Sequence, residues 1–193
     1  MPSQAYRLWK TTRARELGEV ETAHSLLGGT ARGRRYTTQQ INRAYAVLLA
    51  SQFQGFARDL HTESVDYLVT IIPDRRFRIA MKNDLLWNRQ LDSKNANQAT
   101  LGGDYGRLGI PHFWTQVDAV HANNDMRRQW LDELNTWRNA IAHQAFNPAV
   151  FGGTTILHLA RVQRWRRGCN RLAWSLDSVL RTYIQSVTGN HPW

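Results

Sequence analysis

Residues 133–144 read E-L-N-T-W-R-N-A-I-A-H-Q. Arg138, Asn139 and His143 stand there within an apolar pattern that stops before Pro148. The apolar residues recur at spacings of three and four, as on one face of an α-helix: Trp130, Leu131, Leu134, Trp137 and Ile141. We therefore predict a core helix that presents three polar side chains near its C-terminal end, with Asn139 one turn before His143.

The spacing of the arginine and the histidine in this motif is not informative by itself. A chain with 22 arginines and 7 histidines contains about one such pair by chance. A second pair, Arg107 and His112, encloses Gly109 and Pro111, which disfavour a stable helix. The helical context therefore distinguishes the first pair.

Other segments of the first half also have helical periodicity. A long helix is expected from the capping box Thr37 and Gln40 to Pro73, and a helix capped by Asp74 extends to about residue 91. Before them we expect a surface helix over 5–27. Its thin apolar stripe consists of Leu8, Leu17, Val20 and Leu26.

The second half of the chain begins with a polar, glycine-rich stretch. Residues 92–111 are interpreted as a long loop that binds a ligand or moves, or as a disordered segment. A short helix is expected at 112–120 and a last helix at 154–188. No β pattern competes, so the chain is predicted to be all-α, an up-and-down bundle of four to five main helices.

The composition bounds the class of protein. The chain has 193 residues, enough for one domain with a sizeable core. Its start, M-P-S-Q-A-Y-R, lacks the apolar core of a signal peptide, and no apolar run reaches the roughly 18 residues of a membrane span, so we expect a cytoplasmic protein. Cys169 is the single cysteine, which excludes an internal disulfide. We interpret Cys169 as a packing residue.

The charge balance favours a polyanionic partner. The chain has 25 basic and 15 acidic side chains and a net charge of +10, and all basic residues except Lys10, Lys82 and Lys94 are arginines. Guanidinium groups bind phosphate oxygens in a bidentate manner, so nucleic acid is the leading candidate. The alternative is that a GC-rich genome encodes arginine in place of lysine on solvated helix faces.

Two arginine clusters are candidate RNA-binding sites. Arg34 and Arg35 lie in a glycine-containing stretch, which is equally consistent with a solvated basic linker. The second cluster crowds one part of the last helix, and ordinary solvation of that helix is its alternative explanation. It consists of Arg161, Arg164, Arg166, Arg167 and Arg171.

The motif resembles the signature of HEPN domains. R-N-A-I-A-H at 138–143 matches their arrangement of an arginine, a polar residue and a histidine near a helix C-terminus. F-x-x-F-A-R-D-L-H at 53–61 and L-G-I-P-H-F-W at 108–114 resemble the RiboL-PSP-like branch of this family. The resemblance covers residues 37–190, after an N-terminal helix and basic linker at 1–36. It implies an all-helical homodimer that acts as a metal-independent endoribonuclease, a hydrolase of bacterial toxin-antitoxin or phage-defence systems.

The resemblance also implies an assisting residue. In this family a polar side chain from a neighbouring helix often assists the arginine and the histidine. The candidates here are Arg58, Asp59 and Glu63. The alternative is that at least two of them are ordinary solvent-facing residues.

The residue types of the motif suit cleavage of RNA without a metal ion. One group must take the proton of the 2′-hydroxyl, another must protonate the leaving 5′-oxygen, and positive charge must stabilise the phosphate. We assign proton transfer to His143 and phosphate stabilisation to Arg138, while Asn139 orients the imidazole or bonds a phosphate oxygen. Residues five apart differ by about 140° around a helix, so two copies of the motif must converge across a two-fold axis. We expect Trp130, Trp137 or nearby apolar residues to lie partly in the interface of this homodimer.

A lone helical arginine and histidine are otherwise ordinary surface or capping residues. The alternative function is therefore a non-catalytic module that binds RNA or a partner protein, or a subunit of a larger defence complex. Family members inactivated by AMP transfer carry a tyrosine two residues after the histidine, where this chain has Ala145, so that form of neutralisation is not expected. An antitoxin or another defence-system protein remains a candidate partner. The sequence shows no carboxylate cluster or paired histidines at ligand spacing, so we expect neither metal nor cofactor.

Overall fold

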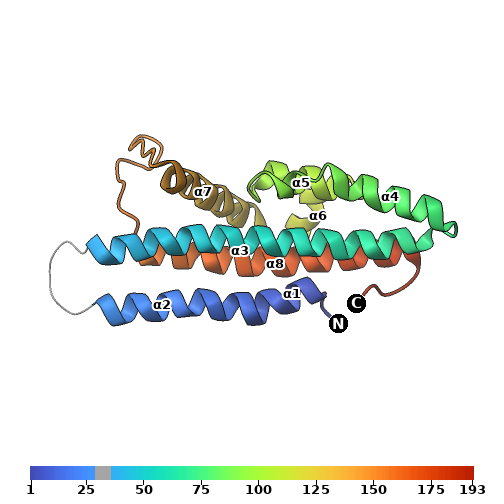
Figure 1. Cartoon of the computed structure of the whole chain (residues 1–193), viewed down its shortest axis with the longest axis horizontal. Coiled ribbons are helices and arrows are strands. Elements are labelled where there is room, and N and C mark those ends of the chain that lie inside the picture. Colours follow the sequence, from blue (N-terminus) through green and yellow to red (C-terminus); the bar gives the residue numbers. More distant parts are fainter. Residues whose placement is uncertain (29–35) are drawn as a thin grey trace.

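The computed structural model describes residues 1–28 and 36–193, and within these ranges every regular element is a helix. Four long helices pack along the molecule (Figure 1): α2 (Ala14–Gly28), α3 (Tyr36–Leu68), α7 (Asn124–His143) and α8 (Leu159–Thr188). α1 (Gln4–Leu8) and a π-helical turn at Trp9–Arg13 precede α2. The predicted all-α bundle is confirmed. None of the helices in the described ranges combines the length and apolarity that a membrane span needs.

Neighbouring helices of the bundle mostly alternate in direction. α2 is antiparallel to α3, and α7 is antiparallel to α8, whereas α3 and α8 run in the same direction (Figure 1). At the start of α7 the Asn124 side-chain amide donates to the Ser175 hydroxyl at 2.9 Å, and farther along Glu133 pairs with Arg164 at 2.9 Å. These contacts set the register of α7 against α8 and so fix where the two ends of α7 lie on the molecule.

Large aromatic side chains form the core between these helices. Trp137 of α7 is 1% exposed, and Trp165 of α8 and Phe53 of α3 are fully buried. The ring centroids of Trp137 and Phe151 lie 4.4 Å apart. Burial of each such side chain stabilises the fold by about 1.5–3 kcal/mol. α7 cannot rotate about its axis without exposing Trp137, so its polar face has a fixed direction.

The N-terminal segment differs from the predicted surface helix. Trp9 is 1% exposed, and its ring centroid lies 5.7 Å from that of Phe53 and 5.6 Å from that of Phe56. Leu26, which was assigned to the apolar stripe, is 80% exposed. The π-helical turn at Trp9–Arg13 adds a residue to one turn. This rotates the helix that follows, so a regular helical period fails to predict which side chains are buried.

Shorter helices pack beside the long ones (Figure 1): α4 (Arg75–Trp87) and α5 (Gln98–Gly106) contact α3, and α6 (Phe113–Val120) contacts α8. The prediction of a loop over 92–111 is wrong, because α5 lies within this stretch. Gly102 and Gly103 lower helix propensity, but a Cβ there would lie 2.8 Å from the Trp114 Nε1 and 2.7 Å from the Gln90 Nε2, respectively. These glycines therefore allow close packing instead of forming a loop.

The start of the last helix also differs from the prediction. α8 begins at Leu159 and not at Thr154. In the non-helical stretch between them Leu157 is 1% exposed, and its carbonyl accepts a hydrogen bond from the Asn42 side chain at 2.8 Å. These contacts with α3 hold the chain outside a helical conformation.

The boundaries of α3 and α4 agree more closely with the sequence. α3 begins at Tyr36, one residue before the predicted capping box at Thr37. The predicted cap of α4 is confirmed, because the Asp74 carboxylate accepts from the Arg76 N–H at 2.8 Å. α4 ends at Trp87, four residues before the predicted end.

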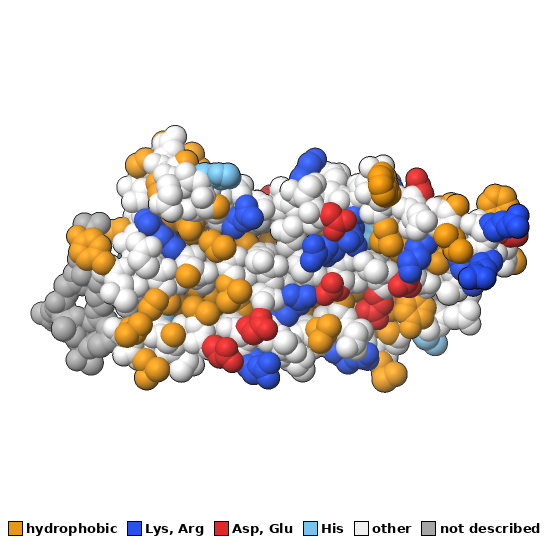
Figure 2. Space-filling view, viewed as in Figure 1, with side chains coloured by type: hydrophobic (Ala, Val, Ile, Leu, Met, Phe, Trp, Pro, Cys, Tyr) orange, Lys and Arg blue, Asp and Glu red, His pale blue; other side chains and the backbone are white. Residues whose placement is uncertain are grey.

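Most apolar residues of α4 are exposed, although Leu85 and Leu86 pack partly against the core. Phe77 is 72% and Trp87 is 83% exposed, and no residue of α4 is buried. Arginines occupy the first turn of this helix, and Figure 2 shows basic side chains at the end of the molecule where α4 begins. α4 is therefore the helix that contributes least to the core.

Candidate functional site

The motif helix α7 ends in a defined turn. Gln144 adopts the left-handed conformation with φ of 53°, and the Ala145 N–H donates to the Ala140 carbonyl at 3.0 Å. These are features of a Schellman motif, here built without glycine. The left-handed conformation costs about 1–2 kcal/mol for a residue other than glycine. The turn fixes His143 as the last helical residue, where the free carbonyl groups carry partial negative charge.

An exposed face of α7 carries most of the motif. Thr136, Asn139 and His143 recur on it at spacings of three and four, and each of them is exposed, as is Ala142. Arg138 lies beside this face and is half-buried. Within the described parts of the chain, no group bonds or pairs with the His143 ring. Both nitrogens of the imidazole are therefore accessible to a ligand.

Asn139 connects the motif to the segment before α5. Its Oδ1 accepts hydrogen bonds from the Arg138 Nη1 at 3.1 Å and from the Asn95 Nδ2 at 2.7 Å. The side chain of Asn139 is therefore oriented by these two donors and not by His143. No local pattern indicates Asn95, because it lies in the polar stretch for which a loop is predicted.

A polar hollow of about 530 Å³ lies beside Asn139. Side-chain amides predominate in its lining: Asn95, Asn97, Gln98, Asn135 and Asn139. An amide both donates and accepts hydrogen bonds, as the edges of nucleic-acid bases do. The hollow therefore has the chemistry to contact a base next to the Arg138 guanidinium.

The three candidate assisting residues are engaged elsewhere in the chain. Asp59 pairs with Arg13 at 2.6 Å, and the first N–H groups of α1 donate to the Glu63 carboxylate at 2.9 and 3.0 Å. Arg58 lies 3.9 Å from Asp92. None of these bonds reaches the motif. Asp59 and Glu63 anchor the N-terminal helices, a partnership that the periodicity of α3 could not indicate.

The arginine cluster of α8 is divided by two carboxylates. Arg161 and Arg164 lie 3.6 and 2.9 Å from Glu133 of α7. Arg166 pairs with Glu21 of α2 at 3.0 Å. These three guanidinium groups hold helices together, so their charge is largely balanced within the fold. On the face in Figure 2, acidic and basic side chains are likewise interspersed over α2 and α3.

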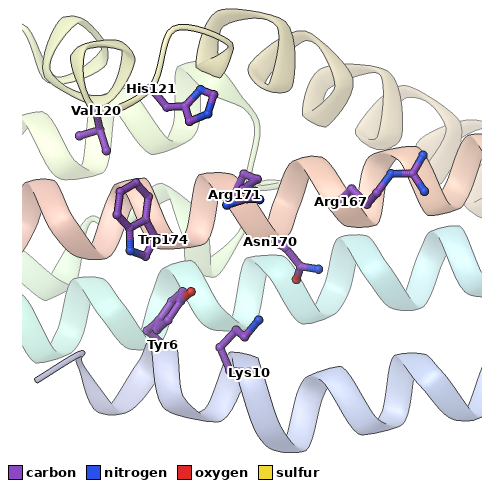
Figure 3. A pocket seen from close by; sticks show the side chains of 8 residues that line it. All are labelled: Tyr6, Lys10, Val120, His121, Arg167, Asn170, Arg171 and Trp174. Atoms are coloured by element: carbon purple, nitrogen blue, oxygen red, sulfur yellow. The ribbon is translucent and has the colours of Figure 1, made fainter.

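The remaining arginines of the cluster are in a different setting. Arg167 and Arg171 are exposed, form no ion pair within the described residues, and line a groove together with Lys10 (Figure 3). Arg34 and Arg35 lie outside the described residues. Two members of the predicted RNA-binding set thus remain as unpaired cations.

The two tryptophans expected in a dimer interface behave differently. Trp137 is buried in the core of its own chain, which leaves Trp130 or nearby apolar residues for the predicted interface. Trp130 is half-buried, and the Arg164 guanidinium lies 5.4 Å from its ring centroid. A Cβ on Gly168 would lie 3.1 Å from the Trp130 ring, so the glycine allows this close approach. Only Trp130 keeps an exposed part.

Other kinds of site receive no support from the described residues. No group of three or more His, Cys, Asp or Glu lies close enough there to hold a metal ion. Burial raises the pKa of Cys169, which keeps the thiol protonated and unreactive. Comparison with family models, with curated proteins and with solved structures found no match to this chain. The side chains at the C-terminal end of α7 are therefore the basis for assigning a function.

Proposed function

We propose that the chain is a metal-independent endoribonuclease that acts at the C-terminal end of α7. The observation that carries the proposal is the Arg138 guanidinium bonded to Asn139 at the surface, on the same helix end as the exposed imidazole of His143. The resemblance of the motif to HEPN domains supports the same assignment. The amide-lined hollow beside Asn139 suits an unstacked RNA base.

The reaction is an internal displacement at phosphorus. The 2′-oxygen forms a bond to phosphorus as its proton passes to a base, and the bond from phosphorus to the 5′-oxygen breaks as that oxygen receives a proton. The products are a 2′,3′-cyclic phosphate and a 5′-hydroxyl, so no water or metal ion is required. His143 performs one proton transfer, and Arg138 stabilises the negative charge on the phosphorane.

A second copy of the chain completes the site in this proposal. Arg138 and His143 are separated by about 7.5 Å along the helix axis and by about 140° around it, so one α7 presents them poorly to a single phosphate. A two-fold axis on the exposed face of α7 brings two arginines and two histidines into one cleft. The second histidine then supplies the other proton transfer. Ala142 and Thr136 are small and exposed there, which allows close approach.

The biological setting follows from the resemblance alone. We infer a cytoplasmic toxin or phage-defence nuclease, held inactive by a partner protein until its trigger arrives. A non-catalytic subunit that binds RNA or a partner is the second candidate. The observation that favours it is the exposed apolar surface of α4, where Phe77 and Trp87 have no partner in the chain's core.

Incubation of the purified protein with RNA in the presence of a chelator tests the proposal. Wild-type protein should cleave, whereas His143→Ala and Arg138→Ala should each lose at least about 100-fold of the rate. Cleavage that survives both substitutions excludes the assigned site. RNA binding without any cleavage supports the non-catalytic candidate.

Matched controls separate loss of chemistry from loss of charge or fold. Arg76→Ala removes an exposed arginine on α4, and His191→Ala removes an exposed histidine near the C-terminus. Both should cleave at the wild-type rate. Circular dichroism should show unchanged helix content for all four variants, because none of the substituted side chains is buried.

A further inference from the structure

A second candidate site lies about a full helix length from the motif. It is a groove of about 580 Å³ between the segment of α1 and the turn that follows it, the end of α6, and the middle of α8 (Figure 3). His121, which precedes α7, is on its wall, whereas His143 ends α7. α7 has 20 residues, so the two histidines are separated by roughly 30 Å along its axis. The groove is therefore distinct from the α7 end.

The groove contains positive charge that the fold does not balance. Lys10, Arg167 and Arg171 line it from two helices, and no carboxylate belongs to the lining. Within the described ranges none of these three side chains forms an ion pair. The contrast with Arg164 is direct, since that arginine lies on the same helix and is bonded to Glu133. Unbalanced cations on facing walls favour a bound anion.

A buried guanidinium behind the groove adds to this charge. Arg127 is 8% exposed, and its polar contacts are to neutral groups: the Asn124 Oδ1 at 2.7 Å and the His121 Nε2 at 3.4 Å. Burial, and then the neighbouring Arg171, lower the pKa of Arg127. A buried charge without a carboxylate is costly, so an anion in the groove stabilises it.

The polar side chains of the groove are arranged as donors. The Asn170 Oδ1 accepts from the Trp9 Nε1 at 3.0 Å, which leaves the Asn170 amide NH₂ free to donate toward the groove. The His121 ring is held by the chain itself, because its Nδ1 accepts from the Asn123 N–H at 3.2 Å and its Nε2 faces the Arg127 Nη2 at 3.4 Å. Burial raises the pKa of Tyr6, whose hydroxyl therefore remains a donor.

The two ends of the groove differ in character. In Figure 3, Trp174, Tyr6 and Val120 lie at one end, Arg167 lies at the other, and Lys10 and Arg171 lie between them. Trp174 is 45% exposed, so part of its indole ring is accessible to a planar ligand. Stacking of a base on an aromatic ring and pairing of its phosphate with guanidinium groups is a common way to bind a nucleotide.

We propose that this groove binds a nucleoside phosphate, with its base on Trp174 and its phosphate between Arg167, Arg171 and Lys10. The ligand is either a free nucleotide or one unit of a single-stranded RNA. The volume of about 580 Å³ lies within the roughly 300–1,000 Å³ of small-ligand sites. This proposal does not rest on cleavage at the α7 end.

The test is a binding experiment on the full chain carrying His143→Ala, which prevents cleavage of the probe. Fluorescence anisotropy of a labelled oligoadenylate is measured, with AMP, ribose 5-phosphate and adenosine as competitors. AMP should compete better than ribose 5-phosphate or adenosine. Competition by AMP identifies a free-nucleotide site, whereas binding of the oligoadenylate without competition by AMP identifies a unit of a strand.

Two pairs of variants locate the binding. The groove double variant, Arg167→Gln and Arg171→Gln, should weaken binding by at least about tenfold. The α4 double variant, Arg75→Gln and Arg76→Gln, removes the same charge and should bind more tightly than the groove double variant. Trp174→Ala should weaken binding by about fivefold or more, while Trp87→Ala should not. All these side chains are exposed, so the fold should be retained.

Three outcomes overturn the proposal: no binding of the oligoadenylate, equal affinity in the groove and α4 double variants, or displacement of the probe by ribose 5-phosphate at the same concentration at which AMP displaces it. Failure of the proposed nuclease has a separate readout. A wild-type protein that does not cleave RNA, but whose groove variants lose AMP competition, refutes the nuclease and retains the groove.

Discussion

The two ends of the α7–α8 pair carry similar arginines in opposite electrostatic settings. Near the motif, Arg161 and Arg164 share the carboxylate of Glu133. Farther along the same helix, Arg167 and Arg171 form no ion pair within the described residues and border a groove without an acid. A sequence cluster of arginines is therefore not one surface, because carboxylates from distant helices divide it into structural and free members.

The largest predicted effect concerns the motif end. Ala142→Arg places a long cation on the exposed face between Asn139 and His143 and leaves the motif itself intact. If two copies of this face meet, the variant should be monomeric and should cleave RNA at least about 100-fold more slowly, since small misplacements at a reacting centre have effects of this size. Analytical ultracentrifugation and the chelator assay measure the two results.

Ala80→Arg on the exposed side of α4 is the matched control and should change neither result. A monomeric wild-type protein, or an Ala142→Arg variant that cleaves normally, contradicts the two-copy site.

The stability of the fold depends on pH through a buried histidine, which limits the pH range in which the two ends of the molecule can be assayed. Burial, and then Arg89, lower the pKa of His61 to about 4 from its ordinary value of 6.5. Between these values the unfolded chain binds a proton that the folded chain does not, so stability falls as the pH decreases from about 6.5 toward 4. The full loss is roughly 3 kcal/mol in the free energy of unfolding.

Urea unfolding at pH 7 and pH 5 measures this effect. His61→Leu removes the titrating group, so the stability of the variant should decrease less between the two pH values than that of the wild type. Equal decreases in both proteins would show that His61 is not the group responsible.

Removal of the Glu133 carboxylate should leave unpaired arginines near the motif, as there are in the groove. Glu133 accepts hydrogen bonds from the Arg164 Nη2 at 2.9 Å and from the Trp165 Nε1 at 2.8 Å. Glu133→Gln keeps the shape and removes the charge, so we expect a loss of about 1–2 kcal/mol in the free energy of unfolding, moderated by partial exposure. RNA binding should become stronger and more dependent on salt, because two guanidinium groups lose their partner.

Chemical denaturation and salt-dependent anisotropy check both parts. Glu19→Gln, on an exposed stretch of α2, is the control with the same change of charge. Weaker RNA binding by Glu133→Gln would indicate that Arg161 and Arg164 act on RNA through their present geometry.

The smallest expected effect on stability is at the groove. Arg167→Gln removes an exposed cation that has no carboxylate partner among the described residues, so the free energy of unfolding should change by less than about 0.5 kcal/mol. Relief of repulsion with Arg171, one turn farther along α8, should make any change stabilising. A clear destabilisation measured by urea unfolding would show that Arg167 supports the fold.

The motif helix could be predicted from the sequence because its burial follows from local spacing. Leu131, Leu134 and Trp137 recur at spacings of three and are buried as predicted. The cap Asp74 was predictable for the same reason, since the residues that it bonds follow it directly. Local patterns therefore identified the helix that presents the candidate site.

Features that depend on distant partners could not be predicted. Gly102 and Gly103 indicate a loop in the sequence. In the structure they lie in a helix, where the side chains of Trp114 and Gln90 leave no room for a Cβ atom. Trp9 could not be assigned to the core because the π-helical turn changes the period of its segment.

The same limit applies to the candidate sites. Asn95, which bonds Asn139, comes from 44 residues earlier in the chain. Glu21, which pairs with Arg166, lies even farther away in the sequence. The division of the arginine cluster into paired and free members therefore required the three-dimensional structure.

The chemical nature of the RNA ends distinguishes cleavage by Arg138 and His143 from metal-dependent hydrolysis. Wild-type protein and a defined RNA are incubated with a chelator, and the termini of the products are identified by mass spectrometry. The account predicts 2′,3′-cyclic phosphates and 5′-hydroxyls, and no products with His143→Ala or Arg138→Ala. Products with 5′-phosphates, cleavage only after a metal ion is added, or unchanged products from both variants would contradict it.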